Sequence, residues 1–272
     1  MFDFRSRRRP QPSGPRGWRA YVIGDVHGRF DLLKNLLTQI EEDILREPSR
    51  KTLLAFVGDL IDRGPNSAQV VEYLRNYDSN VAVRKVFILG NHEEVFLRIL
   101  GGDTSLISKW LEFGGFECLQ SYGLDAGELG ALPAEQVLQT IRQAVPKAHV
   151  EFLGSFVDSC RFQDFLFVHA GIRPGIELDA QRQADMRWIR EPFLSDKTNH
   201  GFVVVHGHTI TTEVETRRNR IGIDTGAYRT GILTALGIEG PRTWVIDTRQ
   251  AEDNALARSN DSFDSRIGSD PC

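Results

Sequence analysis

Five short polar signatures occur along the sequence, and their side chains are of the types that bind metal ions. They are Gly24-Asp25-Val26-His27-Gly28, Gly58-Asp59-Leu60-Ile61-Asp62-Arg63-Gly64, Gly90-Asn91-His92-Glu93, Val168-His169-Ala170-Gly171 and His206-Gly207-His208-Thr209. Each follows an apolar, β-rich run, so we expect each to lie in the loop where a core strand ends. If these loops converge, their Asp, Asn and His donors would form one cluster. Such a cluster is typical of a two-metal hydrolytic site.

The ordered series resembles the calcineurin-like metallophosphoesterases. Within that family it is most similar to the phosphoprotein phosphatases of the bacterial and bacteriophage lambda type, which are serine/threonine protein phosphatases. The resemblance runs from about Tyr21 to about Thr248. One Gly-Asp or Gly-His pair would be weak evidence, since such pairs occur in many turns, whereas five in this order are specific. The resemblance implies a two-sheet α/β/β/α sandwich, while periodicity alone predicts only an α/β fold.

Six residues are expected to hold two divalent ions. Residues two apart on an extended segment face the same side, so the Asp and His of the first signature could both reach one ion. The resemblance assigns Asp25 and His27 to the first metal, Asp59 to both, and Asn91, His169 and His208 to the second. Mixed oxygen and imidazole donors suit Mn, Fe or Zn better than Mg or Ca, and we expect Mn. Taken singly, each residue has a structural alternative, such as Asp59 capping a helix.

His206 and His208 also lie two residues apart on an expected strand, so both could point toward the metals. Many metallophosphoesterases read Gly-His-x-His and use the last His on the first metal. Here Ile210 occupies that place, and the phosphoprotein phosphatases lack the same His. We take His208 as the ligand. His206 stays open between a partner that orients a ligand and a residue without that role.

The resemblance also assigns four residues to the reaction itself. His92 would protonate the leaving oxygen, and Asp62 would hydrogen-bond its imidazole and stabilise the charged form. Arg63 would bind the substrate phosphate through its planar, five-donor guanidinium. Arg190 corresponds to a second phosphate-binding arginine of the lambda-type enzymes. Its alternative is an ordinary surface ion pair with the neighbouring Glu191.

These assignments predict a metal-dependent phosphomonoesterase, specifically a serine/threonine protein phosphatase. A water bridging the two metals would supply hydroxide for in-line attack on the phosphate ester. The alternative is a symmetrical bis(5'-nucleosyl)-tetraphosphate (diadenosine tetraphosphate) hydrolase, but those enzymes usually read Gly-Asp-Leu-Val-Ala-Arg-Gly and Gly-Asn-His-Asp. Asp62 and Glu93 at the variable places favour the phosphatase. A third alternative, an inactive scaffold, would not require every ligand and His92.

Composition limits the partners that the chain can have. Its net charge is only −4 over 272 residues, so we expect a phosphoprotein or phosphopeptide substrate and neither nucleic acid nor a membrane. No apolar run approaches the roughly 20 residues that span a bilayer. Three cysteines, Cys118, Cys160 and Cys272, lie far apart and outside the signatures. Reduced thiols of this kind favour a cytoplasmic protein.

The pattern predicts a basic flexible arm at 1–19, a catalytic domain at 20–250 and a flexible polar tail at 251–272. Within the domain, strands and helices first alternate, as in a parallel sheet covered by helices. The expected strands are 20–23, 52–57, 85–89, 165–168, 202–205, 221–223, 231–236 and 243–246, and the expected helices are 30–42, 68–77 and 93–100. The pattern of residues 101–158 is helical, and in the sandwich that the resemblance implies they would be a cap insertion beside the active site, where loops commonly set substrate choice. We expect its aromatic residues, Trp110 among them, to form local core.

Overall fold

The computed structural model describes residues 11–48, 50–129 and 132–249. The first ten residues of the predicted arm and the whole predicted tail at 251–272 lie outside these ranges. Within the arm, the Ser13 amide donates to the Asp164 carboxylate (2.9 Å) and the Gly14 amide donates to the Gly240 carbonyl (2.8 Å). Strand β1 (Trp18–Ile23) begins two residues earlier than predicted.

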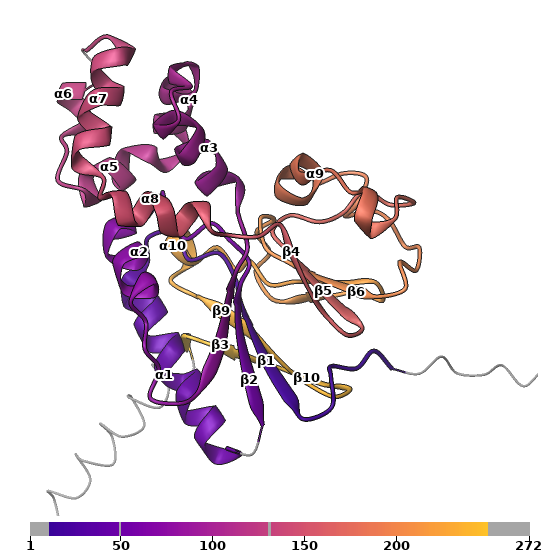
Figure 1. Ribbon diagram of the computed structural model, residues 1–272. Helices are drawn as coiled ribbons and strands as arrows, with labels where there is room; N and C mark the ends of the chain where they lie inside the picture. The colour runs from indigo at the N-terminus through magenta and orange to yellow at the C-terminus, as the bar shows by residue number, and fades with distance from the viewer. Residues whose placement is uncertain (1–10, 49, 130–131, 250–272) are drawn as a thin grey trace, which may run out of the picture.

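The first sheet has the strand order β10-β9-β1-β2-β3 (Figure 1). Its central strands β1, β2 (Lys51–Phe56) and β3 (Val83–Phe87) are parallel, with Ala20 opposite Leu53. Parallel neighbours require crossovers, which helices α1 (Phe30–Arg46) and α2 (Ser67–Arg75) provide. Strands β9 (Thr234–Glu239) and β10 (Arg242–Asp247) extend the sheet in the antiparallel sense.

The second sheet has the order β4-β5-β6-β8-β7. Its strands are β4 (Ser159–Phe162), β5 (Phe165–Val168), β6 (Val203–His206), β7 (Glu215–Thr216) and β8 (Arg220–Gly222), of which β5, β6 and β8 are parallel. Helix α9 (Gln183–Trp188) covers its outer face, where Met186 packs with Leu166 and Val168.

Alternation along the strands builds the layers. In β1, Tyr21 and Ile23 pack against the helices, whereas Ala20 and Val22 face the second sheet. Successive side chains of a strand point to opposite faces, so one strand contributes to both cores. The layers are therefore helix, sheet, sheet and helix, which confirms the predicted α/β/β/α sandwich (Figure 1).

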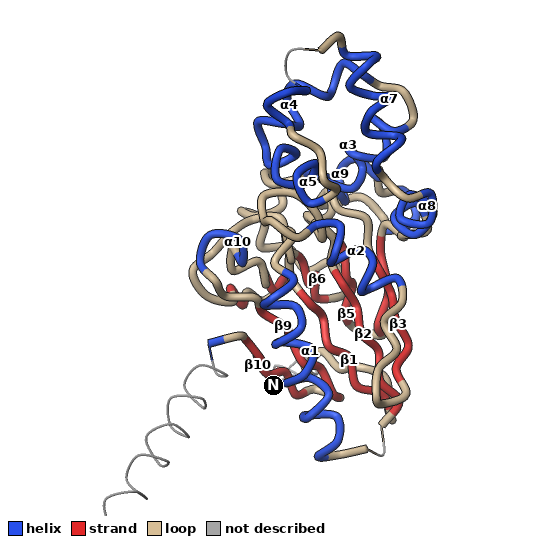
Figure 2. Tube along the Cα trace, turned by 90° about the vertical axis from the view of Figure 1, so that its left-hand side faces the viewer, coloured by secondary structure: helices blue, strands red, loops and turns tan. Residues whose placement is uncertain are grey.

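Short helices form the predicted cap between α3 (Asn91–Leu100) and β4. They are η1 (Thr104–Leu106), α4 (Ile107–Trp110), η2 (Leu111–Gly115), α5 (Phe116–Ser121), α6 (Ala126–Leu129), α7 (Ala134–Ala144) and α8 (Lys147–Gly154). Figure 2 shows them gathered at one end of the sandwich. Among the described residues, no helix is both long and apolar enough to cross a membrane.

Several element boundaries differ from the prediction for local reasons. Helix α3 begins at Asn91 instead of residue 93, because the Glu93 side chain accepts the Gly90 amide and caps the helix start. Strand β9 begins at Thr234, because Gly231 ends helix α10 (Ala227–Thr230) in a left-handed conformation with φ 75°. The sequence analysis did not predict β4, β7, α9, α10, η1 or η3 (Leu178–Ala180). Elements of two to six residues carry too little periodicity to be recognised.

Candidate metal centre and active site

The structure brings the six predicted ligands together at the strand ends next to the cap. All six are at most 8% exposed: Asp25, His27, Asp59, Asn91, His169 and His208. They follow strands β1, β2, β3, β5 and β6. After β1, β2, β5 and β6 the ligands lie in the loop that directly follows the strand. Carboxyl ends of parallel strands are the usual place for ligands in such sheets. Asn91 differs slightly, since it is the first residue of helix α3.

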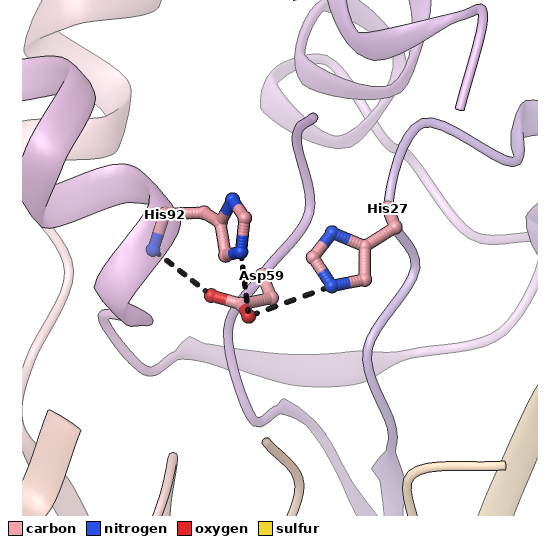
Figure 3. A group of neighbouring side chains, drawn as sticks. All are labelled: His27, Asp59 and His92. Atoms are coloured by element: carbon pink, nitrogen blue, oxygen red, sulfur yellow. Dashed lines mark hydrogen bonds and ion pairs between the residues drawn. The ribbon is translucent and has the colours of Figure 1, made fainter. Parts of the chain in front are cut away.

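The Asp59 carboxylate lies between the imidazoles of His27 and His92 (Figure 3). Its Oδ2 is 3.5 Å from His27 Nε2 and 3.9 Å from His92 Nε2, while its Oδ1 is 3.4 Å from His169 Nε2. The two oxygens thus face different sets of imidazoles. Two groups able to hold an ion share Asp59, one with His27 and His92 and the other with His169 and His208. This is the arrangement that a bridging carboxylate requires.

In its neutral form, His169 turns a lone pair toward another acceptor, the Asn91 side-chain oxygen, with no proton between them. His169 Nδ1 lies 2.7 Å from the Val57 carbonyl, so its proton is donated there and Nε2 carries the lone pair. That Nε2 is 2.8 Å from Asn91 Oδ1 and 3.2 Å from His208 Nδ1. Such separations between lone-pair atoms are expected of ligands around one cation.

Buried polar atoms without partners point to the same conclusion. In the part of the chain that the structure describes, Asp25 Oδ1, His27 Nε2 and His208 Nε2 are buried without a hydrogen bond. Most buried polar atoms in proteins are hydrogen-bonded, so such a group needs an explanation. The His27 Nδ1–H donates to the Ile61 carbonyl at 2.8 Å, which leaves Nε2 as a free lone pair toward Asp59. The residues present therefore fit a divalent metal centre.

Burial lowers the pKa of two of the ligand histidines, whereas in His169 the charge of Asp59 and a hydrogen bond to it outweigh burial and raise the pKa. Burial lowers the pKa of His27 well below its usual range, and burial, reinforced by His169, lowers the pKa of His208 to about 3. Both imidazoles are therefore neutral and able to bind a cation. Burial and the nearby carboxylates of Asp224 and Asp59 raise the pKa of Asp25. A divalent cation would relieve this repulsion between buried carboxylates.

His92 and Asp62 form a buried pair beside the cluster. The His92 Nδ1–H donates to Asp62 Oδ2 at 2.6 Å, which directs Nε2 toward Asp59. Burial opposes the imidazolium charge, but Asp59 and the hydrogen bond to Asp62 outweigh it and raise the pKa of His92. Nε2 is therefore placed to carry a proton into the site. The same nitrogen is also close enough to His27 and Asp59 to act as a ligand.

The two predicted phosphate-binding arginines both reach the site. The Arg63 amide donates to the Gly114 carbonyl of the cap (3.0 Å), and its guanidinium lies 4.8 Å from the centre of the Tyr228 ring. The Arg190 guanidinium donates to the carbonyl of His208 at 3.3 Å. Glu191 accepts hydrogen bonds from Ser195 instead, so the structure favours the site over a local Arg190–Glu191 pair.

Glu93 has a positioning role that the sequence analysis did not identify. It is fully buried, and its carboxylate accepts the amides of Asp59 (2.8 Å), Leu60 (2.7 Å), Ile61 (3.3 Å) and Gly90 (3.0 Å). Burial and the charge of Asp59 raise its pKa to about 7, although the charge of His169 and the hydrogen bond from the Asp59 amide oppose the shift. Glu93 thus holds the Asp59 loop against the start of α3. Its position three residues after Gly90 is the signal that could have indicated this role.

The signatures adopt unusual backbone conformations. His27, Asp59, Asp62, Arg63 and His208 all have φ between 44° and 70°. For residues with a side chain this region costs of order 1–3 kcal/mol each, and it persists where the surroundings fix the geometry. Strain of this kind commonly marks a functional site.

Two signature glycines are required by close approach. A Cβ on Gly90 would lie 2.2 Å from Asp59 Oδ1, and a Cβ on Gly207 would lie 1.9 Å from Asp25 Oδ1. Neither position can carry a side chain without displacing a ligand carboxylate.

Three further residues contact the site. Trp110, expected as local core, is buried and donates its indole N–H to Asp62. Asp224, also buried, follows β8 and contributes to the raised pKa of Asp25. Tyr228 contacts His27 and Arg63. For Asp224 the signal was a sixth signature of the same kind, Ile223-Asp224-Thr225-Gly226.

His206 is buried at the end of β6, and among the described residues neither group able to hold a metal ion includes it. Its Nδ1–H donates to the Gly207 carbonyl at 3.0 Å, and its ring packs edge-on against Phe193. Burial lowers its pKa to about 4. The residue therefore supports the chain beside His208 through main-chain contact.

Comparison with known proteins places this site in a family. The family model for calcineurin-like phosphoesterases matches residues 19–230. The chain is 28% identical over 234 residues to the asymmetrical bis(5'-nucleosyl)-tetraphosphatase PrpE of Bacillus cereus, covering 79% of this chain and 88% of that protein. It is 43% identical over 81 residues to the symmetrical bis(5'-nucleosyl)-tetraphosphatase of Coxiella burnetii, covering 30% of this chain and 24% of that protein.

Solved structures share the fold at low sequence identity. A provisionally assigned diadenosine tetraphosphatase has a TM-score of 0.60 at 20% identity, covering 85% of this chain and 94% of the other. A cold-active protein tyrosine phosphatase of a Shewanella species has a TM-score of 0.51 at 17% identity, covering 84% of this chain and 77% of the other. These likenesses support the architecture.

The geometry predicts that Asp59 serves two ions. Asp59→Asn should lower bound metal from two ions per chain and reduce turnover by more than about 100-fold, since an amide has one oxygen donor and no charge. Elemental analysis of metal content alongside phosphatase assays measures both effects. Chelation of the wild type should abolish activity, and Mn should restore it.

Asp43→Asn is the matched control for this substitution, because Asp43 accepts a hydrogen bond from Tyr21 (2.6 Å) outside the centre. It should keep two ions and full turnover. Two ions and near wild-type turnover in Asp59→Asn would show that Asp59 does not bridge.

Proposed function

Because the chain belongs to the calcineurin-like phosphoesterase family, a family of phosphate-ester hydrolases with a dinuclear metal centre, we propose that it is a serine/threonine protein phosphatase. The observation that carries this proposal is the buried Asp62–His92 hydrogen bond beside the metal centre (2.6 Å). The remaining donors of the site are consistent with hydrolysis of many phosphate esters. The pair is the part that discriminates among leaving groups.

The reason lies in the basicity of the leaving oxygen. Departure of a serine or threonine side chain generates a strongly basic alkoxide, so a positioned proton donor accelerates the step. A nucleotide leaving group is a weak base and gains less. Asp62 fixes the His92 tautomer with the proton on Nδ1 and stabilises the charged ring, which then also carries a proton on Nε2. A site built to hold a charged imidazole therefore supports an alkyl phosphomonoester as substrate.

The other residues act on the phosphoryl group. When bound, the two metal ions lower the pKa of a water molecule and neutralise phosphoryl charge. We assign Arg63 and Arg190 to the phosphoryl oxygens. Their guanidinium groups reach the site from two segments that are distant in the sequence, one after β2 and the other after α9. The contact with the Tyr228 ring restricts the Arg63 side chain. We propose Mn as the native metal from the mixture of carboxylate, amide and imidazole donors.

The proposed partner is a phosphoprotein or phosphopeptide. A net charge of −4 gives no general attraction for nucleic acid or an anionic membrane. Cys118 and Cys160 are free thiols, which supports a cytoplasmic location. Cys272 lies outside the described residues.

Hydrolysis of dinucleoside tetraphosphates is the second candidate. It is favoured by the relatives named bis(5'-nucleosyl)-tetraphosphatases, one of which aligns over 79% of this chain. The two candidates share the same metal centre and differ in leaving group, so a comparison of substrates separates them.

The general-acid assignment predicts the effect of His92→Asn. The variant should keep both metals and lose roughly 10²–10⁴-fold in rate on alkyl phosphates. The loss should be smaller on aryl phosphates, whose leaving groups need little protonation. Rates on a phosphoserine peptide and on p-nitrophenyl phosphate, with metal content measured in parallel, test this.

His149→Asn provides the control, since His149 is a buried histidine paired with Glu72 (2.9 Å) outside the centre. Its ratio of alkyl to aryl rates should match the wild type. Equal losses on both substrates in His92→Asn would exclude the general acid, and loss of an ion would identify His92 as a ligand instead.

The substrate proposal predicts a higher kcat/KM for phosphoserine or phosphothreonine peptides than for diadenosine tetraphosphate. Some phosphotyrosine activity should accompany it, because the metal centre contacts only the phosphate. Since kcat/KM reports differential binding of transition states, all substrates should be compared in one Mn buffer. If the dinucleotide is preferred tenfold or more, the second candidate replaces the first.

A further inference from the structure

The cap reaches the catalytic pair through one tryptophan side chain. Trp110, the last residue of α4, is 3% exposed, and its indole N–H donates to Asp62 Oδ2 at 2.9 Å. The same oxygen accepts the Nδ1–H of His92 at 2.6 Å. Two donors from different segments of the chain therefore converge on one carboxylate oxygen.

Packing leaves the indole ring little freedom. It stacks on Phe96 of α3 with ring centres 5.4 Å apart. On another side it meets the backbone of η2, where a Cβ on Gly115 would lie 2.4 Å from ring atom Cδ2. The residue at 115 must therefore be glycine for the ring to occupy this place. A side chain fixed on two sides can hold its hydrogen-bond partner in one orientation.

The same cap segment holds the residue after Asp62. The Gly114 carbonyl accepts the Arg63 amide at 3.0 Å, and a Cβ on Gly114 would lie 2.5 Å from that nitrogen. Asp62 and Arg63 both adopt left-handed backbone conformations, with φ 70° and 67°. A strained pair of residues persists only where its surroundings fix it, and residues 110–115 supply that contact.

We propose that Trp110 is a positioning residue for the reaction, and that the cap orients His92 through the Trp110–Asp62 hydrogen bond. The inference rests on the proposed function of His92 as general acid. The indole N–H fixes the rotation of the Asp62 carboxylate, and the carboxylate fixes the imidazole. Without the Trp110–Asp62 hydrogen bond, His92 Nε2 is held less firmly in the orientation that proton donation requires.

Trp110→Phe tests the inference, because phenylalanine keeps a ring against Phe96 and removes the donor. Loss of one hydrogen bond to a charged group should lower kcat on a phosphoserine peptide by about tenfold. KM and the two bound ions should be unchanged, since Trp110 touches neither phosphate nor ligand. The loss should be smaller on p-nitrophenyl phosphate.

Trp188→Phe is the matched control. Trp188 also donates its indole N–H to a carboxylate at 2.9 Å, but to Glu94 and outside the Asp62–His92 pair. This variant should keep the wild-type ratio of rates on the two substrates. If kcat on the phosphoserine peptide fell equally in both variants, loss of either indole donor would slow the reaction, and the effect could not be assigned to the Asp62–His92 pair.

A double-mutant cycle isolates the contact. In an Asp62→Ala background, adding Trp110→Phe should change kcat by less than about twofold, because the partner has already been removed. A further tenfold loss in that background would show that Trp110 acts through another residue and would overturn the inference.

The hydrogen bond also has a signature independent of turnover. The chain has four tryptophans, so its amide correlation spectrum contains four indole N–H signals, and the signal missing in Trp110→Phe belongs to Trp110. Asp62→Ala should move that signal more than the other three. An unmoved signal would overturn the proposed contact even in an inactive protein.

The outcomes separate this inference from the proposed function. Wild-type protein without activity on the phosphoserine peptide would overturn the proposed function and the catalytic role of Trp110 together. Active wild type with unchanged kcat in a folded Trp110→Phe variant would overturn the role of Trp110 alone. If Trp110→Phe does not fold, the Trp110 signal is assigned by replacing each of the other three tryptophans in turn, and its shift in Asp62→Ala decides the contact.

Discussion

The buried carboxylate of Asp59 is the group on which the rest of the site depends. A carboxylate 2% exposed is stable only with compensating charge or hydrogen bonds. Burial alone would raise its pKa, but the neighbouring His169 and His92 outweigh that and lower it well below its usual range. Each of these histidines lies on a different strand end or helix start. The chain thus surrounds one negative charge with cationic or metal-binding groups from both sheets.

The packed sandwich is rigid, and contacts with it fix the backbone of the signature loops. Glu93 binds four amides around Asp59, and the glycines at 90 and 207 allow backbone to approach ligand carboxylates closely. Left-handed residues then direct side chains inward at a local cost that the packed sandwich offsets. The cap adds a second source of constraint, because residues 110–115 contact Asp62 and Arg63 from outside the sandwich. The inserted segment therefore contacts both Asp62 and Arg63, the residues that we propose for orienting His92 and for binding the phosphate.

Much of this arrangement was predictable from the sequence. The strands with regular apolar runs, the sandwich and the helical character of residues 101–158 were all predicted, because periodicity and signature order are local properties. The six ligands also converge, since residue type and position after a strand restrict what each can do. Contacts between distant segments could not be predicted: Trp110 is 48 residues from Asp62, and nothing in its own neighbourhood indicates a carboxylate partner. Glu93 was noted only as a subfamily marker, because its role depends on the path of the Asp59 loop.

The central claim is that the signatures build one site for two ions on either side of Asp59. Anomalous diffraction from crystals of the wild-type chain grown with Mn tests it most directly. The account predicts two peaks, one bonded to Asp25, His27 and Asp59 and the other to Asp59, Asn91, His169 and His208, with His92 bonded to neither. A single peak, or a peak bonded to His92 Nε2, would contradict it.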